Sequence, residues 1–312
     1  MNQRYRGIAF LLAFGVLLGK AVQAAPPPAY KLRLIFKQNE ASRYQTVAEV
    51  VATMPSMRSF IDKGKAPNKR GGDITTEKME TVQNSIQVSI LQQMVVNKVL
   101  PDGGAMVLAS TLSGQVVRDG NQMAPPEKNP MLVHYDTLGN IKAMRATGTT
   151  KQTDLMAGLL GSGALGFQRV YLPDKPVQLG DSWVQPVKVP GWNGQGKANA
   201  KLIRLEKVGR YQTARISAKV VLPIQIYLNA NLQPLTAQKI KKATSALVGT
   251  LNMTFETNFA LLEGKMIRTG GRGTGTFRIQ PLKTSTKAPK TPAPSSDLAF
   301  TLEMSIGSSY IE

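Results

Sequence analysis

The sequence contains no cysteine and only one histidine among its 312 residues. Without cysteine, the chain has no disulfide, no thiolate zinc site, no iron–sulfur cluster, no thiol nucleophile and no acylated lipoprotein cysteine. With His134 alone, a metal site built from several histidines is excluded, and any Ser-His-Asp mechanism must use this residue. Most thiol enzymes and many metalloproteins are therefore excluded.

Acidic and aromatic residues are also scarce. The chain carries 19 Asp and Glu against 39 Lys and Arg, a formal net charge of +20, and only 9 Phe, 8 Tyr and 2 Trp. So few aromatic rings argue against a sugar-stacking surface, and without an RNA-binding signature no nucleic-acid partner is expected. The positive charge favours anionic surfaces such as phospholipid head groups or acidic polymers. A basic surface that only maintains solubility explains the charge equally well.

The first 24 residues have the pattern of a secretory signal peptide. Arg4 and Arg6 precede an apolar run at 7–19, and Val22 and Ala24 take the −3 and −1 positions of a cleavage site. The run is shorter than the roughly 20 residues that cross a bilayer, so an uncleaved anchor is less favoured. Removing 24 residues and their three basic side chains leaves a soluble mature chain of 288 residues with net charge +17. We expect it in the periplasm or outside the cell, without a transmembrane segment.

The mature chain shows the period-2 alternation of half-buried β-strands. Residues 30–36 (YKLRLIF) alternate apolar and basic side chains, residues 298–306 (LAFTLEMSI) alternate again, and residues 211–221 are a further strand candidate. Turn sequences separate such stretches, for example PDGG at 101–104 and DTLGN at 136–140. These patterns predict a mainly β protein built from antiparallel meanders.

The order of strands and turns suggests an internal duplication, with two related meander halves that form curved sheets or half-barrels. The first half is expected over residues 25–152 and the second over residues 173–312, joined by a Gly-rich connector at 153–172. A chance coincidence among β-meanders explains the same order without a duplication. The sequence leaves open whether the halves form one continuous sheet or two domains.

One or two short helices and a flexible loop are expected to interrupt the β pattern. Residues 154–160 are predicted to form a short helix in the connector, and residues 236–247 a basic amphipathic helix. Residues 283–296 (KTSTKAPKTPAPSS) have low complexity and are predicted to form a flexible loop.

No complete catalytic motif is found. Positions 134 and 136 share one face of a strand, so Asp136 could orient His134 as a base. The chain has no Gly-x-Ser-x-Gly elbow, calcium loop, Walker motif or dinucleotide fingerprint, and its scattered carboxylates fix no pair for glycoside hydrolysis. The sequence therefore favours a structural His134 and a non-enzymatic protein without metal or cofactor. A hydrolase is the less favoured alternative.

Five residues are candidates for ligand contact: Trp192, Lys239, Lys241, Lys242 and Arg272. Trp192 is a loop tryptophan, and the three lysines lie in the predicted basic helix. Arg272 lies in the glycine-rich stretch GGRGTG at 270–275, where backbone amides could hold an anion. A glycine-dense strand is the simpler explanation of that stretch.

Residues 176–183 read PVQLGDSW, in which Trp183 is expected to be a core anchor. A mid-chain Pro-Val-x-x-Gly-Asp-x-Trp element, after an early strand–turn–aromatic strand, resembles uncharacterised exported β-rich protein families of bacteria. This resemblance implies a fold of meanders and no established activity. A looser likeness is to envelope lipid carriers built as open β half-barrels, in which a curved sheet encloses an apolar cavity.

The charge, the export signal and the β-meanders together predict an exported binder of an amphipathic or anionic ligand of the cell envelope, such as a lipid or glycolipid. Peripheral contact with a membrane is compatible with this hypothesis. The alternative is a structural or interaction protein, whose partner is another envelope protein or a polymer.

Overall fold

The computed structural model describes residues 28–55, 81–123, 130–147, 170–188, 195–229, 243–282 and 298–311. These residues form one antiparallel sheet of twelve strands, and they contain no helix. The strands are β1 (Ala41–Pro55), β2 (Thr81–Val99), β3 (Ala105–Arg118), β4 (Asn121–Met123), β5 (Met131–Tyr135), β6 (Ile141–Ala146), β7 (Ser182–Val187), β8 (Gly196–Val208), β9 (Tyr211–Leu228), β10 (Ser245–Ala260), β11 (Lys265–Pro281) and β12 (Leu298–Ile311). The predicted mainly β fold is confirmed, and strands from both sides of the connector belong to the same sheet.

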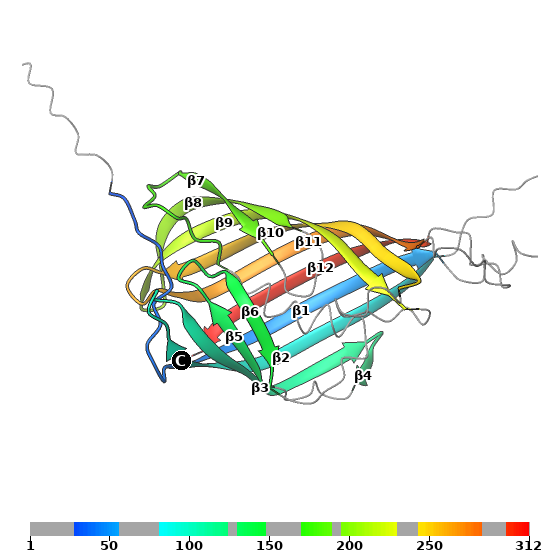
Figure 1. The fold of residues 1–312 in the computed structure, drawn as a ribbon, viewed down its shortest axis with the longest axis horizontal. Helices are drawn as coiled ribbons and strands as arrows, with labels where there is room; N and C mark the ends of the chain where they lie inside the picture. The colour runs from blue at the N-terminus through cyan, green and yellow to red at the C-terminus, as the bar shows by residue number, and fades with distance from the viewer. Residues whose placement is uncertain are drawn as a thin grey trace, which may run out of the picture.

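The first and last strands meet in the middle of this sheet. The strand order is β6-β5-β3-β2-β1-β12-β11-β10-β9-β8-β7, with β4 beside β3. Most pairings join strands that follow one another in the chain, but β1 and β12 pair over eleven positions, with Tyr44 opposite Tyr310. Figure 1 shows the blue β1 beside the red β12 at the centre of a strongly curved sheet. The strands β6 and β7 are consequently left as its two edges.

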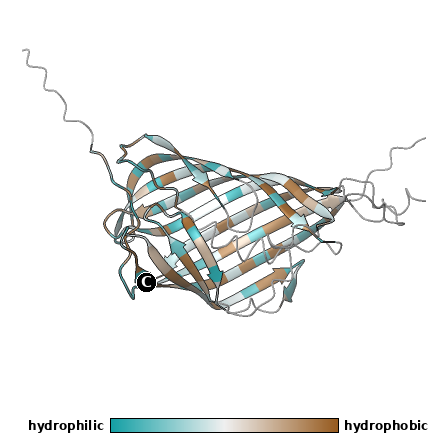
Figure 2. Cartoon of the chain, in the orientation of Figure 1, coloured by the Kyte–Doolittle hydropathy of each residue, from teal (hydrophilic) through white to brown (hydrophobic). Residues whose placement is uncertain are grey.

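The long strands alternate between buried and exposed side chains. In β9, Ile216, Val220 and Ile224 are buried, whereas Lys219 and Val221 are exposed. The same alternation of hydrophobic and hydrophilic residues runs along the strands in Figure 2. Because successive side chains of a strand point to opposite faces, the sheet has an apolar face, which we call the inner face, and an outer face that is mostly polar but also exposes apolar side chains such as Val47 and Val221.

Strand β11 has glycine at consecutive inner positions. A Cβ atom on Gly271 would lie 2.5 Å from the ring of Phe255, and one on Gly273 would lie 2.6 Å from Met253. Both larger residues belong to β10 and stand opposite these glycines in the sheet. Large side chains therefore lean over β11, and the predicted glycine-dense strand at 270–275 is confirmed.

Short turns gather at one end of the sheet, which we call the closed end. These connections lie at residues 100–104, 136–140, 209–210 and 261–264. Two segments without regular structure also pack at this end: Tyr30 forms an isolated antiparallel bridge with Val177, and Leu34 N–H donates to the Thr137 carbonyl at 2.8 Å.

The predicted strand at residues 30–36 is therefore wrong as secondary structure. Only Tyr30 has a bridge partner, and Ile35 N–H donates to the Gly264 carbonyl of a turn at 3.0 Å. The alternation still reports burial, since Leu32 is fully buried and Lys31 is exposed. An extended segment that packs across strand ends has the same apolar period as a strand but no ladder partner.

Neither predicted helix is found in the described residues. The first predicted helix, at 154–160, lies outside them, and so do residues 236–242 of the second. The predicted flexible loop at 283–296 also lies outside them. The end of that helix, Ser245–Leu247, instead begins β10, where Ser245 pairs with Leu228 on one side. The helical prediction is wrong for these three residues. Their hydrogen bonds to β9 and β11 stabilise a strand more than the helical spacing of their apolar side chains stabilises a helix.

The PVQLGDSW element forms a turn and the start of edge strand β7. Gly180 has a φ angle of +90°, which favours glycine, and the Asp181 carboxylate accepts from the Gln178 N–H at 2.8 Å. Trp183 packs against the inner core, and its indole N–H donates to the Tyr171 carbonyl at 3.1 Å. The motif therefore has a structural explanation, with Trp183 as the expected core anchor.

Candidate functional site

The inner face contains a small cavity at the closed end. Its volume is about 100 Å³. The apolar part of its lining includes Leu34, Phe36, Tyr44, Met94, Val107 and Tyr135. Two charged side chains, Glu40 and Lys265, also line it. The cavity is therefore an apolar pocket with a charged border.

Lys265 is held among tyrosines. Its side chain is 18% exposed, and its ammonium nitrogen donates to the Tyr310 hydroxyl at 3.3 Å. The same nitrogen lies 4.3 Å from the Tyr310 ring centre and 5.7 Å from the Tyr211 ring centre, distances that allow cation–π attraction. The Glu40 carboxylate lies 3.7 Å away. Lys265 is thus a partly buried cation whose carboxylate partner is beyond ordinary hydrogen-bond distance.

Tyr44 lies on the apolar side of the same cavity. Its hydroxyl donates to the Met266 carbonyl at 3.2 Å, and its ring meets the Tyr310 ring edge-on at 5.7 Å. Burial, together with the neighbouring Tyr310, raises the pKa of Tyr44 above its usual value. The phenol therefore remains neutral and contributes a fixed hydrogen bond rather than a charge.

A second hollow, of about 570 Å³, lies on the outer face over β9–β12 and β1. Lys219, Thr254 and Arg272 line it from three adjacent strands and stand directly opposite one another in register. Glu303 and Glu49 line the other side. Cations therefore stand over β9 and β11, and carboxylates over β12 and β1.

Arg272 is the only predicted ligand contact that falls within the described residues. It is exposed on β11 and lines this outer groove. Trp192, Lys239, Lys241 and Lys242 lie outside the described residues.

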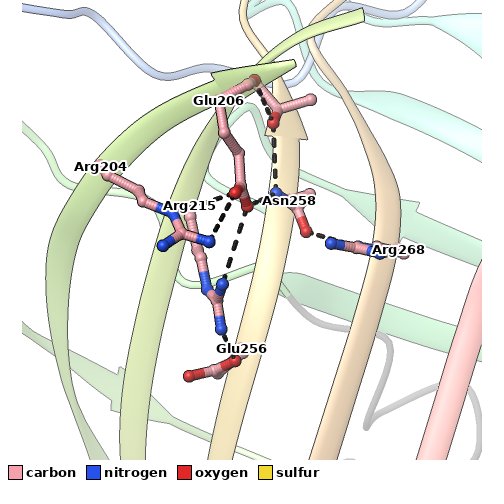
Figure 3. A network of polar contacts seen from close by, with 7 residues as sticks. Arg204, Glu206, Arg215, Glu256, Asn258 and Arg268 are labelled. Carbon is pink, nitrogen blue, oxygen red and sulfur yellow. Dashed lines mark hydrogen bonds and ion pairs between the residues drawn. The ribbon is translucent and has the colours of Figure 1, made fainter. Parts of the chain in front are cut away.

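A network of charged and amide side chains joins β8, β9, β10 and β11 (Figure 3). Asn258 donates to the Glu206 carboxylate at 2.7 Å and accepts from the Arg268 guanidinium at 2.7 Å. Arg204 donates to Glu206 at 2.9 Å. Arg215 pairs with Glu206 at 4.0 Å and also with Glu256. Sequence reasoning missed this network, although a buried Asn in the run TNFA was a possible signal.

The network lies where two strand pairs, β8–β9 and β10–β11, change register. The β8–β9 ladder shifts between Leu202 and Arg204, and the β10–β11 ladder shifts between Asn258 and Phe259. A bulge bends its strand and leaves backbone groups that need other partners. The network therefore links four strands where two of their ladders are irregular.

We expect Asn258→Ala to lower the free energy of unfolding by about 2 kcal/mol. Asn258 is 4% exposed, and its removal leaves Glu206, Arg268 and Thr213 without their shared amide. Urea unfolding measures this loss. Asn252→Ala, on an exposed position of the same strand, is the matched control and should change stability by less than about 0.5 kcal/mol. Equal effects of the two substitutions would contradict the structural role of Asn258.

Hydrogen bonding from Asn258, assisted by Arg204 and Arg215, lowers the pKa of Glu206. Because the folded pKa lies below the unfolded value of about 4.3, the stabilisation is complete above that pH and is lost as the pH falls. We expect Glu206→Gln to make the loss of stability below about pH 5 shallower than in the parent protein. Urea midpoints between about pH 3 and pH 7 measure this change, and parallel curves would contradict it.

His134 and Asp136 do not form the catalytic pair that their spacing allowed. Asp136 accepts from the N–H groups of Leu138 and Asn140 and pairs with Lys142 at 2.9 Å. Burial alone would raise its pKa, but hydrogen bonds from Asn140 and Lys142 outweigh this, so the pKa is lowered. His134 lies on β5, and its Nε2 atom is buried with no hydrogen-bond partner in the described part of the chain. Asp136 therefore acts as a turn residue.

Among the described residues, no three His, Asp or Glu side chains gather as a potential metal site. No helix within the described ranges is long and apolar enough to cross a membrane. The sequence matches no protein-family model and no curated protein.

Proposed function

We propose that this chain is an exported, non-enzymatic protein that binds an amphipathic ligand of the cell envelope, a lipid or glycolipid. In this proposal the curved sheet is an open half-barrel, and the apolar chain of the ligand lies against its inner face. The signal-peptide pattern of the first 24 residues supports export to the periplasm or the cell exterior. We further propose that the protein needs no metal or cofactor.

The observation that carries the proposal is an apolar inner face that crosses most of the sheet. One core cluster joins buried residues of β1 and β7–β12, with Val50, Leu202, Leu222, Phe255 and Ile306 among its members. These side chains are already buried against one another, so in this proposal a flexible hydrocarbon chain enters between them from the side of the two edge strands, which are not paired with each other.

We also propose that the sheet arose from two related halves. In both halves, consecutive strands follow one another across the sheet in the same order, from β6 to β1 and then from β12 to β7 on the other side of the β1–β12 pair. A repeat would therefore superpose β7 on β1 and β8 on β2. The turns at 100–104 and 209–210 then fall at the same end, as do the turns at 136–140 and 261–264. This order supports a duplication, with β12 as the strand that has no counterpart.

A second candidate function is recognition of an anionic envelope polymer or protein. The outer groove favours it, because Lys219 and Arg272 line about 570 Å³ and neither has an ion-pair partner in the described part of the chain. Contact with the negatively charged surface of a membrane would use the same charges.

Native mass spectrometry of the protein, purified gently from its own envelope, tests the proposal. We expect an intact mass that begins at Ala25, with a stoichiometric lipid or glycolipid that extraction then identifies. An unliganded mass, together with a polymer or protein captured by cross-linking, would contradict the first function and support the second. The substitutions Lys219→Gln and Arg272→Gln should weaken only the second kind of complex.

A further inference from the structure

We propose that the closed-end cavity binds the carboxylate of a single-chain amphiphile, with Lys265 as its anchor. The proposal rests on the proposed function, since the hydrocarbon chain of such a ligand would continue along the inner face. It adds the chemical class of the head group and the residue that recognises it.

Lys265 is incompletely paired. An ammonium group has three hydrogen-bond donors. One is used by the Tyr310 hydroxyl at 3.3 Å, while the Glu40 carboxylate at 3.7 Å is too far for an ordinary hydrogen bond. Lys265 lines the cavity, so a carboxylate there can accept a charge-assisted hydrogen bond from it.

The Tyr310 hydroxyl lies beside this ammonium. The Tyr310 oxygen accepts from Lys265, so its own proton is available for a second hydrogen bond to the same carboxylate. Tyr44, by contrast, already donates to the Met266 carbonyl. Lys265 therefore brings the Tyr310 hydroxyl to the border of the cavity, and Ser42 adds a hydroxyl to the lining itself, so the site offers a cation and hydroxyl groups as donors to a carboxylate.

Charge and size favour a carboxylate over larger head groups. Lys265 and Glu40 together carry no net charge. When a ligand displaces Glu40, Lys265 can balance only one negative charge, so a doubly charged phosphate is disfavoured. A volume of about 100 Å³ is far below the roughly 300–1,000 Å³ of ordinary ligand pockets. It suits a small head group with the first part of one chain, rather than a sugar or two chains.

Glu40 acts in this proposal as an internal competitor for Lys265. Its carboxylate is the nearest anion to the ammonium in the described part of the chain, yet the pair is loose and partly exposed. Such a pair contributes little to stability. A ligand carboxylate that hydrogen-bonds directly to Lys265 can therefore replace it.

The test compares dodecanoate with dodecanol, bound to the mature chain from Ala25 and measured by calorimetry. We expect Lys265→Met to weaken dodecanoate binding about tenfold to a hundredfold, because a charged hydrogen bond is lost. Dodecanol binding should change less than about twofold, since its hydroxyl carries no charge. The matched control is Lys175→Met, an exposed lysine of the same end, which should change neither affinity.

Glu40→Gln gives a second and opposite readout. It removes the competing carboxylate and keeps the tyrosine contacts of Lys265, so dodecanoate should bind about threefold more tightly. This variant tests the proposed carboxylate site even if Lys265→Met does not fold. A role of Lys265 in packing alone predicts no such gain.

Unchanged dodecanoate affinity in both variants, or equal losses for dodecanoate and dodecanol, would overturn Lys265 as the anchor and leave the proposed function standing. If neither compound binds the parent protein but a two-chain lipid copurifies with it, the proposed carboxylate site is overturned and the proposed function is not. If nothing binds, both fail.

Discussion

The substitution Phe255→Ala is expected to lower the free energy of unfolding by about 4 kcal/mol. Phe255 is 1% exposed, its ring lies 6.2 Å from that of Tyr171, and it covers the space that Gly271 leaves open on β11. Its removal creates a cavity in the middle of the inner face, which the surrounding ladder hydrogen bonds prevent from collapsing. Urea unfolding measures the effect as a lower midpoint at an unchanged slope.

Thr254→Ala is the matched control for this substitution. Thr254 is the preceding residue on the same strand, but it is exposed on the outer face. Its replacement should change stability by less than about 0.5 kcal/mol. A loss at Thr254 as large as that at Phe255 would contradict the assignment of inner and outer faces.

Covalent closure of the gap between the sheet edges is expected to slow ligand exchange at least about tenfold. Strands β6 and β7 are the unpaired edges, and one contact across the gap is a hydrogen bond of 2.7 Å from the Gln185 amide to Asn140. Asn140 lies in the turn at 136–140, so this contact joins the two edges at the closed end. We expect a long chain to enter where the edges move apart beyond it, and a bridge at this contact to hold the edges together. Loops and edges held by few hydrogen bonds open more readily than the centre of a sheet.

The double variant Asn140→Cys with Gln185→Cys tests this entry route. The chain has no other cysteine, so a short bifunctional maleimide bridges only these two positions. Exchange of a fluorescent fatty acid is measured by stopped flow before and after bridging. The unbridged double variant controls for the lost hydrogen bond. Equal exchange rates with and without the bridge would contradict entry through the gap.

Both edge strands carry features that discourage pairing with another chain. Pro186 in β7 has no N–H to donate, and β6 carries Lys142 and Arg145. These features agree with a gap that opens for a small ligand rather than one that recruits a further strand.

The strands were largely predictable because local pattern and long-range pairing agree in them. The strand candidate at residues 211–221 lies within β9, and the turn at 101–104 separates β2 from β3. The pairing of β1 with β12 was not predictable, since nothing local in residues 43–53 specifies a partner near the other end of the chain.

The candidate site was less accessible to sequence reasoning. Lys265 has no distinguishing feature in the sequence, because its proximity to Glu40 and Tyr310 depends on the pairing of distant strands. The network around Asn258 was hidden for the same reason. By contrast, Arg272 stood out by its glycine neighbours, which the structure explains by the larger side chains that lean over β11.

Photo-crosslinking tests the central claim, that a hydrocarbon chain lies on the inner face, most directly. A fatty acid with a diazirine on its chain is bound to the mature protein and irradiated, and the modified residues are located by mass spectrometry. We predict labelling of inner residues that do not line the outer groove, such as Leu222 and Phe255, with the outer residues Lys219 and Thr254 unlabelled. Labelling confined to Lys219, Thr254 and Arg272 would contradict the account and place the ligand in the outer groove.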